Sequence, residues 1–252
     1  STIKITKTPE RSMLQRMSTM FLSKKPDISV RLKSAEYSIN LHDVLSNETL
    51  DLIQIEGLEM GTYLNEILDY YHNKAQRPII IYDAHNAETI IQRRAIKSDI
   101  SKPKRWPTAL YSIVQLSRIR EFEIEICSNS DAVICVSHED CTALKKLFPR
   151  LNPTILPNGI FLSDYPETTK HAKITPPTLV FSGKMDYRPN IDAADWFANE
   201  VFPRIRNMHD EVKFLIVGQS PTRQVLNLAK HHGITVTGDV DDIQPYIAAA
   251  TV

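Results

Sequence analysis

The sequence has few cysteines and lacks the common short catalytic signatures. Its three cysteines, Cys127, Cys135 and Cys141, are odd in number and show no CxxC spacing. Neither a disulfide framework nor a zinc site is therefore indicated, and a reducing, cytoplasmic compartment suits the chain. No GxGxxG, Walker phosphate loop or HExxH occurs, which leaves hydride transfer, ATPase and zincin chemistry without support.

Net charge and long apolar runs are also missing. Thirty basic and thirty acidic residues cancel, so no global field attracts nucleic acid, and any phosphate binding has to be local. No apolar run approaches the length of a transmembrane helix, although peripheral contact with a membrane surface stays open. Apolar residues make up 42% of the chain and charged residues 24%, which is typical of a protein that folds in water.

From about residue 51 the chain alternates short β-branched runs with longer segments of helical spacing. This cadence predicts an α/β fold of βαβ units with parallel sheets. A helix over residues 10–23 is also expected. The predicted strands are residues 51–56, 78–83, 132–136, 154–156, 179–181, 213–217 and 234–237.

The clearest predicted helix covers residues 191–206. Its apolar side chains recur every three or four positions, and Asn190 is predicted as its N-cap. We expect this apolar face to pack on the second sheet. The residues that form the face are Ala194, Phe197, Val201 and Ile205.

The predicted elements divide into two domains. Between residues 157 and 177 the periodicity lapses into a polar, proline-containing segment that is typical of a linker. We predict a first Rossmann-like domain over residues 1–165, a linker over 166–177 and a second domain over 178–252. The last part holds only three predicted strands, fewer than a domain of ordinary size, so we expect it to be truncated.

Residues 181–190, FSGKMDYRPN, lead from a strand through a glycine turn into a helix. A helix N-terminus with Lys184 and Arg188 beside it suits a diphosphate. The alternative is an ordinary strand–glycine–helix turn with solvated cations, and spacing alone favours it because no full phosphate-loop signature is present.

Two more glycine turns follow later strands, at Gly218 and at Gly238–Asp239. Together with Gly183 they are expected to line the top of one sheet with close backbone approaches. Nucleotide-binding α/β domains have this arrangement.

His85 follows the predicted strand 78–83, and Glu56 ends the strand before it. Because ligands of open α/β sheets bind at the carboxyl ends of strands, His85 could contact a sugar hydroxyl or a phosphate in a crevice that Glu56 also faces. One alternative is that His85 caps the next helix together with Asn86. The other is that Glu56 is a surface carboxylate, and position alone favours this interpretation of Glu56.

Two other polar segments are expected to be structural unless further information favours a role. Asn158 and Gly159 leave the last strand of the first domain, either into an interdomain cleft or as an ordinary Asn-Gly turn. The acidic run Glu121, Glu123 and Glu125 is predicted to be the solvated side of a helix near residues 107–129 rather than a catalytic carboxylate pair.

Taken together, these segments resemble retaining glycosyltransferases of GT-B fold, specifically glycosyltransferase family 4. The order and spacing of the motifs carry the resemblance. It implies two Rossmann-like domains that face a cleft, the first for the acceptor and the second for a nucleotide-sugar. The matching segments are residues 82–88 (YDAHNAE), 130–137 (SDAVICVS), 156–159 (LPNG), 181–193 (FSGKMDYRPNIDA), 216–218 (IVG) and 236–240 (VTGDV).

The resemblance also implies roles for single residues. His85 matches the catalytic-cleft histidine that contacts the donor sugar, and Asn158 matches the asparagine of the interdomain motif. Gly183, Lys184 and Arg188 fall in the diphosphate loop. The family's commoner pattern has an arginine after the glycine and a lysine several residues later, where this chain has Lys184 and Asn190. The turn 238–242 borders the nucleobase.

In the family, two paired glutamates hold the donor, and a glycine-rich loop opens the first domain. In this chain the glutamates would lie beyond Val252, and the loop would lie before Ser1. We therefore expect residues 1–252 alone to transfer no sugar at a useful rate. The resemblance implies no metal or other cofactor, and a glycan, a lipid-linked sugar or a small molecule as acceptor. The alternatives are a GT-B sugar-nucleotide epimerase or phosphorylase, and a non-catalytic binding module.

Overall fold

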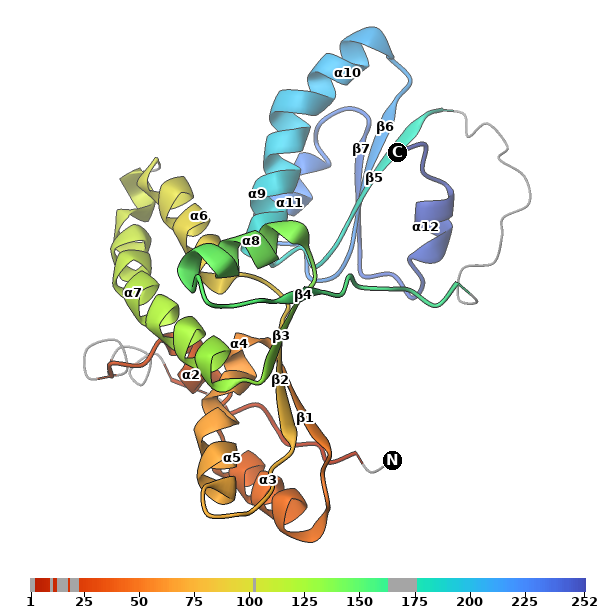
Figure 1. The fold of residues 1–252 in the computed structure, drawn as a ribbon. Helices are drawn as coiled ribbons and strands as arrows, with labels where there is room; N and C mark the ends of the chain where they lie inside the picture. The colour runs from red at the N-terminus through yellow and green to blue at the C-terminus, as the bar shows by residue number, and fades with distance from the viewer. Residues whose placement is uncertain (1–2, 10, 13–17, 19–22, 102, 163–175) are drawn as a thin grey trace. The chain divides into compact units, whose positions relative to one another are not determined.

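The computed structural model describes residues 3–9, 11–12, 18, 23–101, 103–162 and 176–252. The chain divides into two compact units, Ser1–Gly159 and Ile160–Val252. Each unit is built on a parallel sheet whose strands alternate with helices (Figure 1), so the predicted α/β class is confirmed. The expected helix over residues 10–23 and the expected linker over residues 166–177 lie largely outside the described residues.

The first unit contains a four-stranded sheet in the order β1-β2-β3-β4, in which all neighbours are parallel. The register places Glu56 beside Asp83 at the carboxyl ends of the first two strands. Every strand overlaps a β-branched run of the sequence. The strands are β1 (Leu52–Glu56), β2 (Ile79–Ala84), β3 (Ala132–Cys135) and β4 (Thr154–Ile155).

Successive strands of this sheet follow one direction across it, and right-handed crossovers then place the connecting helices on one face. Ile80, Tyr82 and Ala84 of β2 are fully buried in the core under these helices. On the opposite face Leu52 and Ile79 remain about half exposed. The helices are α2 (Asp27–Arg31), α3 (Ala35–Asn47), α4 (Gly57–Met60), α5 (Leu64–Tyr71), α6 (Glu88–Ile100), α7 (Trp106–Asn129) and α8 (His138–Leu147), with short 3₁₀ turns at Gly61–Tyr63 and Pro103–Arg105.

The second unit has a three-stranded sheet in the order β5-β6-β7. Beyond β5 the last residues of the chain add two ladder-like hydrogen bonds, from Thr251 N–H to Thr178 O and from Val180 N–H to Val252 O. This return crosses the sheet in the opposite direction, and α12 accordingly lies on the other side of the sheet from α9 (Figure 1). The elements are β5 (Thr178–Ser182), α9 (Arg188–Trp196), α10 (Phe202–Met208), β6 (Lys213–Val217), α11 (Arg223–Leu228), β7 (Ile234–Gly238) and α12 (Gln244–Ala248).

A π-helical turn at Phe197–Val201 interrupts the helix predicted over residues 191–206. A π turn inserts extra chain into the helix and therefore rotates the residues that follow it. Ala194, Ala198 and Phe202 are buried in the core of this unit, whereas Phe197 and Val201 are only partly buried. The predicted packing of this helix on the second sheet is confirmed for Ala194, Phe197 and Ile205, which lie in or against the second core. Val201 is not part of that core, because the π turn brings Ala198 and Phe202 there instead.

The prediction of Asn190 as N-cap is also wrong. The helix begins earlier, with Tyr187 as N-cap and Pro189 in the first turn, a position that proline favours because its missing N–H has no helical acceptor there. Asn190 lies inside this first turn, and its Nδ2 donates to the carbonyl oxygen of Lys184 at 3.0 Å. Its side chain therefore closes the preceding loop instead of capping the helix.

Candidate functional site

The first candidate site lies at the carboxyl ends of β1 and β2, where Glu56 and His85 meet. His85 Nε2 lies 2.8 Å from Glu56 Oε2. Gln54 Nε2 donates to Glu56 Oε1 at 2.8 Å and to Asp83 Oδ2 at 2.9 Å. We call Gln54, Glu56, Asp83 and His85 the His85 cluster.

The His85 cluster can orient an imidazole and present hydrogen-bonding groups to a polar ligand. The side chains of His85 and Glu56 are 51% and 57% exposed, so both are accessible to a ligand. Single ligand atoms of Glu56, Asp83 and His85 lie within 4.8 Å of one another, so this group could hold a metal ion. The Gln54 amide, however, already donates to two of the three.

The alternative that His85 and Asn86 cap the next helix is wrong. The N-cap of α6 is Ala87, and no side-chain capping hydrogen bond is made at this position. The donors of this helix start bond to side chains from other helices. Ala87 N–H donates to Asp140 Oδ1 at 2.9 Å, and Glu88 N–H donates to Glu123 Oε1 at 2.7 Å.

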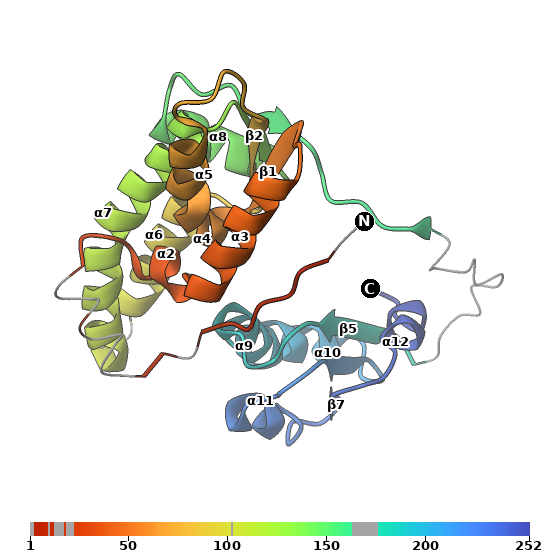
Figure 2. The ribbon, with the colours of Figure 1, turned by 90° about the horizontal axis from the view of Figure 1, so that it is seen from below.

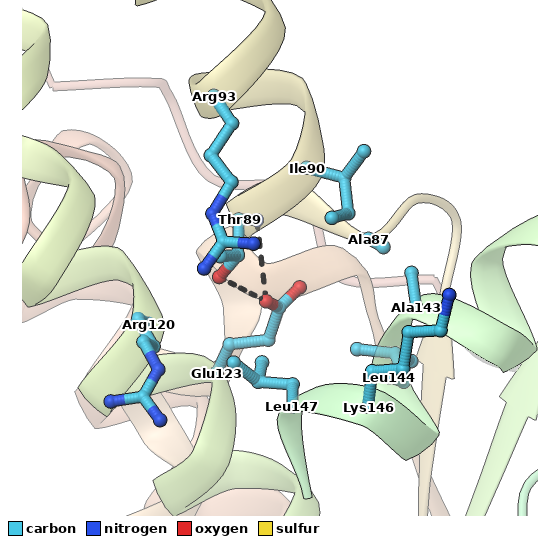
Figure 3. A pocket seen from close by; sticks show the side chains of 10 residues that line it. All are labelled: Ala87, Thr89, Ile90, Arg93, Arg120, Glu123, Ala143, Leu144, Lys146 and Leu147. Atoms are coloured by element: carbon cyan, nitrogen blue, oxygen red, sulfur yellow. Dashed lines mark hydrogen bonds between the residues drawn. The ribbon is translucent and has the colours of Figure 1, made fainter.

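Glu123 is fully buried, which overturns the prediction that the run 121–125 is solvated along its length. Its Oε2 accepts from Thr89 N–H at 3.2 Å and from Thr89 Oγ1 at 2.5 Å (Figure 3). In α7 it lies four residues after Ile119 and three before Ile126, both of which are buried. Helical spacing therefore puts it on the apolar face, and only Glu121 and Glu125 are exposed.

The two acidic side chains at the start of α6, Glu88 and Glu123, both have raised pKa values. Burial raises the pKa of Glu123, against the hydrogen bonds from Thr89 and Glu88. Burial, followed by repulsion from Glu59 and Glu123, raises the pKa of Glu88 from 4.5 to about 7. The N-terminus of a helix favours a bound anion. At the N-terminus of α6 the carboxyl group of Glu123 already occupies the position that a bound anion would take.

A pocket of about 130 Å³ opens beside Glu123 between α6, α7 and α8 (Figure 3). Arg93, Arg120 and Lys146 are among the residues that line it. Its volume is well below the roughly 300–1,000 Å³ of sites for drug-sized ligands. We therefore assign it to the packing of the helix start, which fixes the loop that carries His85.

The second candidate site lies in the second unit, where the three predicted glycine turns meet. Gly218 N–H donates to Gly238 O at 3.2 Å, and Gly183 N–H donates to Val217 O at 3.1 Å. An added Cβ on Gly218 would lie 1.7 Å from Gly183 O. The turns therefore touch through their backbones, and Met185 N–H, which donates to Gln219 O at 2.8 Å, adds a further link.

The loop between β5 and α9 presents cations and free donors above these glycines. Lys184 Nζ lies 3.7 Å from Asp186 Oδ2, and Arg188 Nε lies 3.7 Å from Asp192 Oδ2. In the described part of the chain the main-chain N–H groups of Lys184 and Asp186 have no acceptor. Since Pro189 lacks an N–H, the loop offers more donors to an anion than the helix start itself.

The other predicted site residues are exposed. Asn158 and Gly159 follow β4, and a Cβ on Gly159 would meet no atom within 4 Å. Asp239 is exposed directly after Gly238. Sequence reasoning did not single out Gln54 and Asp83, although their places at strand ends beside Glu56 would have indicated them once the register was known.

Comparison of sequences finds one match to a family model. Residues 176–252, which include the whole glycine-lined site, match the model described as glycosyl transferases group 1. No curated protein sequence matches the chain significantly. In the described residues no helix is both long enough and apolar enough to cross a membrane.

Solved structures share the fold at low sequence identity. A sucrose-phosphate synthase from Thermosynechococcus elongatus has a TM-score of 0.58 and 16% identity over 85% of this chain and 52% of its own. An α,α-trehalose-phosphate synthase (UDP-forming) from Burkholderia xenovorans has a TM-score of 0.55 and 9% identity over 94% of this chain and 60% of its own. A trehalose-6-phosphate synthase has a TM-score of 0.50 and 11% identity over 84% and 53% of the two chains.

The chain thus spans between half and three fifths of the length of these structures. Identities this low establish the fold and no more. The fold is the α/β GT-B fold of these synthases, and residues 176–252 carry a sequence signature of group 1 glycosyl transferases.

Proposed function

We propose that the whole protein is a glycosyltransferase that moves a sugar from a nucleotide-sugar donor to an acceptor with retention of configuration. The observation that carries the proposal is the glycine-lined site of the second unit, with Lys184 and Arg188 beside it. This site lies within the segment that matches group 1 glycosyl transferases. One structural neighbour is described as UDP-forming, and another, a trehalose-6-phosphate synthase, is described in connection with glycosyl transfer with retention.

In this proposal the loop after β5 binds the diphosphate of the donor. Glycine at both positions lets the two turns pack backbone against backbone, because a Cβ on Gly218 would collide with Gly183 O and a Cβ on Gly183 with Asn190 Nδ2. The ion pair of Lys184 with Asp186 is exposed and long at 3.7 Å, and such a pair contributes little to stability, so Lys184 can turn to a phosphate at small cost. Arg188, 3.7 Å from Asp192, adds a second positive charge to the loop.

The reaction breaks the bond between the anomeric carbon and the diphosphate oxygen. The acceptor hydroxyl oxygen forms its new bond to that carbon on the same face, and its proton passes to the departing diphosphate. Lys184, Arg188 and the free N–H groups of the loop stabilise the charge that develops on the leaving group. We propose that no cofactor takes part.

The His85 cluster takes the role of a sugar contact in this proposal. Glu56 accepts a hydrogen bond from His85, and this holds the ring in one orientation. The other ring nitrogen is then available to a sugar hydroxyl or a phosphate oxygen. We propose a cytoplasmic protein, because all three cysteines are free thiols buried in the first unit and nucleotide-sugar chemistry does not need them.

The test is calorimetric titration of the chain with UDP, GDP and ADP and with the corresponding nucleosides. Replacing Lys184 and Arg188 with Ala should weaken diphosphate binding by at least about tenfold per residue, because a charge-assisted hydrogen bond contributes about 1.5–3 kcal/mol. Nucleoside binding should change much less. Lys213→Ala with Lys230→Ala, two exposed cations of the same unit, is the matched control.

An equal loss for diphosphates and nucleosides would exclude the diphosphate role. Binding of no nucleotide at all would favour a non-catalytic module. If nucleotides bind, product analysis of a labelled nucleotide-sugar with the full-length protein distinguishes transfer from epimerisation, since only transfer places the label on an acceptor.

A further inference from the structure

The hairpin of α6 and α7 presents its large apolar side chains outward. Along the first half of α7 the buried positions are Ala109, Ser112 and Gln115. The side chains of Trp106, Leu110 and Ile113 are exposed instead. A helix that packs on a core normally shows the reverse arrangement, with its large apolar residues buried.

These exposed side chains form one surface with the end of α6. Trp106, Leu110 and Ile113 are spaced by four and three positions and so share a stripe of α7. Trp106 Nε1–H donates to Ile100 O at 3.2 Å, which holds the indole beside the last residue of α6. The exposed fractions of Ile100, Trp106, Leu110 and Ile113 are 55%, 61%, 62% and 48%. We call these four residues the hairpin apolar patch.

Polar contacts hold the inner face of the hairpin, so the outward patch is not a packing fault. Gln92 Nε2 donates to Ser112 O at 3.1 Å, and Gln115 Oε1 accepts from Asp27 N–H at 2.9 Å. The two helices lie side by side, and their connecting turn lies away from strands β1–β4 (Figures 1 and 2). The patch is therefore carried at the outer end of a rigid hairpin.

The charge around the patch is strongly one-sided. Residues 93–120 contain eight of the thirty basic residues and one of the thirty acidic residues, which makes this segment seven charges positive and the rest of the chain seven charges negative. The single acid, Asp99, is fully buried, 3.9 Å from Arg105. Arg93, Arg94 and Lys97 of α6 are exposed.

We propose that this surface docks the protein on an anionic lipid bilayer, with the hairpin apolar patch in the interface and the surrounding cations on lipid headgroups. Tryptophan and aliphatic side chains bordered by Lys and Arg have the composition of interfacial membrane-binding helices. The opposite charge of the remaining chain orients the hairpin toward the bilayer. A symmetric dimer through two copies of the patch is disfavoured, because the positive charges of the two hairpins would meet.

The test measures cosedimentation with vesicles of phosphatidylcholine alone and of phosphatidylcholine with phosphatidylglycerol. We expect binding to the anionic vesicles that weakens as salt is added. The charge variant replaces three hairpin cations (Arg93→Gln, Arg94→Gln, Lys97→Gln), and its matched control replaces three exposed cations elsewhere in the same unit (Lys74→Gln, Lys145→Gln, Arg150→Gln). The hairpin variant should bind about 100-fold more weakly, since each cation near an anionic surface contributes roughly fivefold. The control should bind like the unmodified chain.

A fluorescence measurement tests the apolar part on an intact hairpin. The chain has two tryptophans, so Trp196→Phe leaves Trp106 as the only one. Its emission should shift to the blue on anionic vesicles and be quenched by brominated lipid chains. Leu110→Ser in this background should reduce the shift.

Any of four outcomes would overturn the proposal. The emission of Trp106 stays unchanged while anionic vesicles are present, or the control charge variant loses as much binding as the hairpin variant. The third is a concentration-dependent dimer that Leu110→Ser dissociates, since the patch would then be an interface between copies. The fourth is binding of RNA without binding of vesicles, because the apolar patch would then have no role.

Discussion

Replacing Gly218 with Ala is the sharpest test of the glycine-lined site. The new Cβ would lie 1.7 Å from the carbonyl oxygen of Gly183 and 2.8 Å from its carbon, whereas real Cβ atoms essentially never approach within 3.0 Å. The neighbouring atoms belong to a backbone, so no rotamer change can relieve the contact. Gly218 also has φ +150°, a conformation that L-residues rarely adopt.

The size of the effect follows from what must move. Forcing extra atoms into a packed site costs about 1–3 kcal/mol. Moving either turn also weakens the bonds Gly218 N–H to Gly238 O and Gly183 N–H to Val217 O, each with a net contribution of about 1 kcal/mol. We therefore expect a loss of about 3–5 kcal/mol in the second unit, which corresponds to faster amide exchange by a factor of about 150 to 4,000.

Hydrogen exchange read by mass spectrometry can locate this loss within the chain. Amides of β6 should exchange faster in the variant, while those of β2 in the first unit serve as an internal reference. Gly238→Ala tests backbone strain without a steric collision, because Gly238 has φ +77° but open space around its Cβ position. We expect it to lower the stability of the second unit by about 1–2 kcal/mol. Gly159→Ala, with neither feature, should stay within about 0.5 kcal/mol. If Gly218→Ala is as well protected as Gly159→Ala, the close contact of the turns is wrong.

Two further predictions concern the buried carboxylates of the first unit. Glu123→Ala should lower the free energy of unfolding by about 3 kcal/mol in urea titration, because three donors of α6 lose their acceptor, and Glu123→Gln should lose less; equal values for both variants would contradict this. Because the pKa of Glu88 is raised from 4.5 to about 7 in the folded chain, its contribution to stability is complete below pH 4.5 and is lost as the pH rises through 7. The free energy of unfolding of Glu88→Gln, from melting curves, should therefore rise by up to about 3 kcal/mol relative to that of the unmodified chain between pH 4.5 and 7. A difference between the two chains that does not change with pH would contradict the raised pKa.

Much of the fold could be predicted because its signals are local. Each strand coincides with a β-branched run, since a buried parallel strand needs only its own few residues to be apolar. The meeting of Gly183, Gly218 and Gly238 was predictable for a related reason. Parallel strands of one sheet end at the same edge, so three glycines that each follow a strand must come close together.

The N-terminal end of α9 could not be predicted to the residue. Asn190 is a good N-cap by type, but the proline at position 189 allows the helix to start before it. The π turn at Phe197–Val201 likewise has no local signal in the apolar spacing. Both features depend on how the helix has to meet the core under it, which a periodic pattern does not contain.

By itself the sequence determined the alternation of strands and helices, the parallel sheets and the glycine turns at one sheet edge, because neighbouring residues decide each of them. Only the tertiary structure decided which charged groups are buried and which meet. Glu123 is buried because α6 needs an acceptor for its first N–H groups, and Asp83 stands beside Glu56 because of the register of two strands. Such contacts join residues far apart in the sequence, and their free energy depends on distances that exist only once the chain has folded.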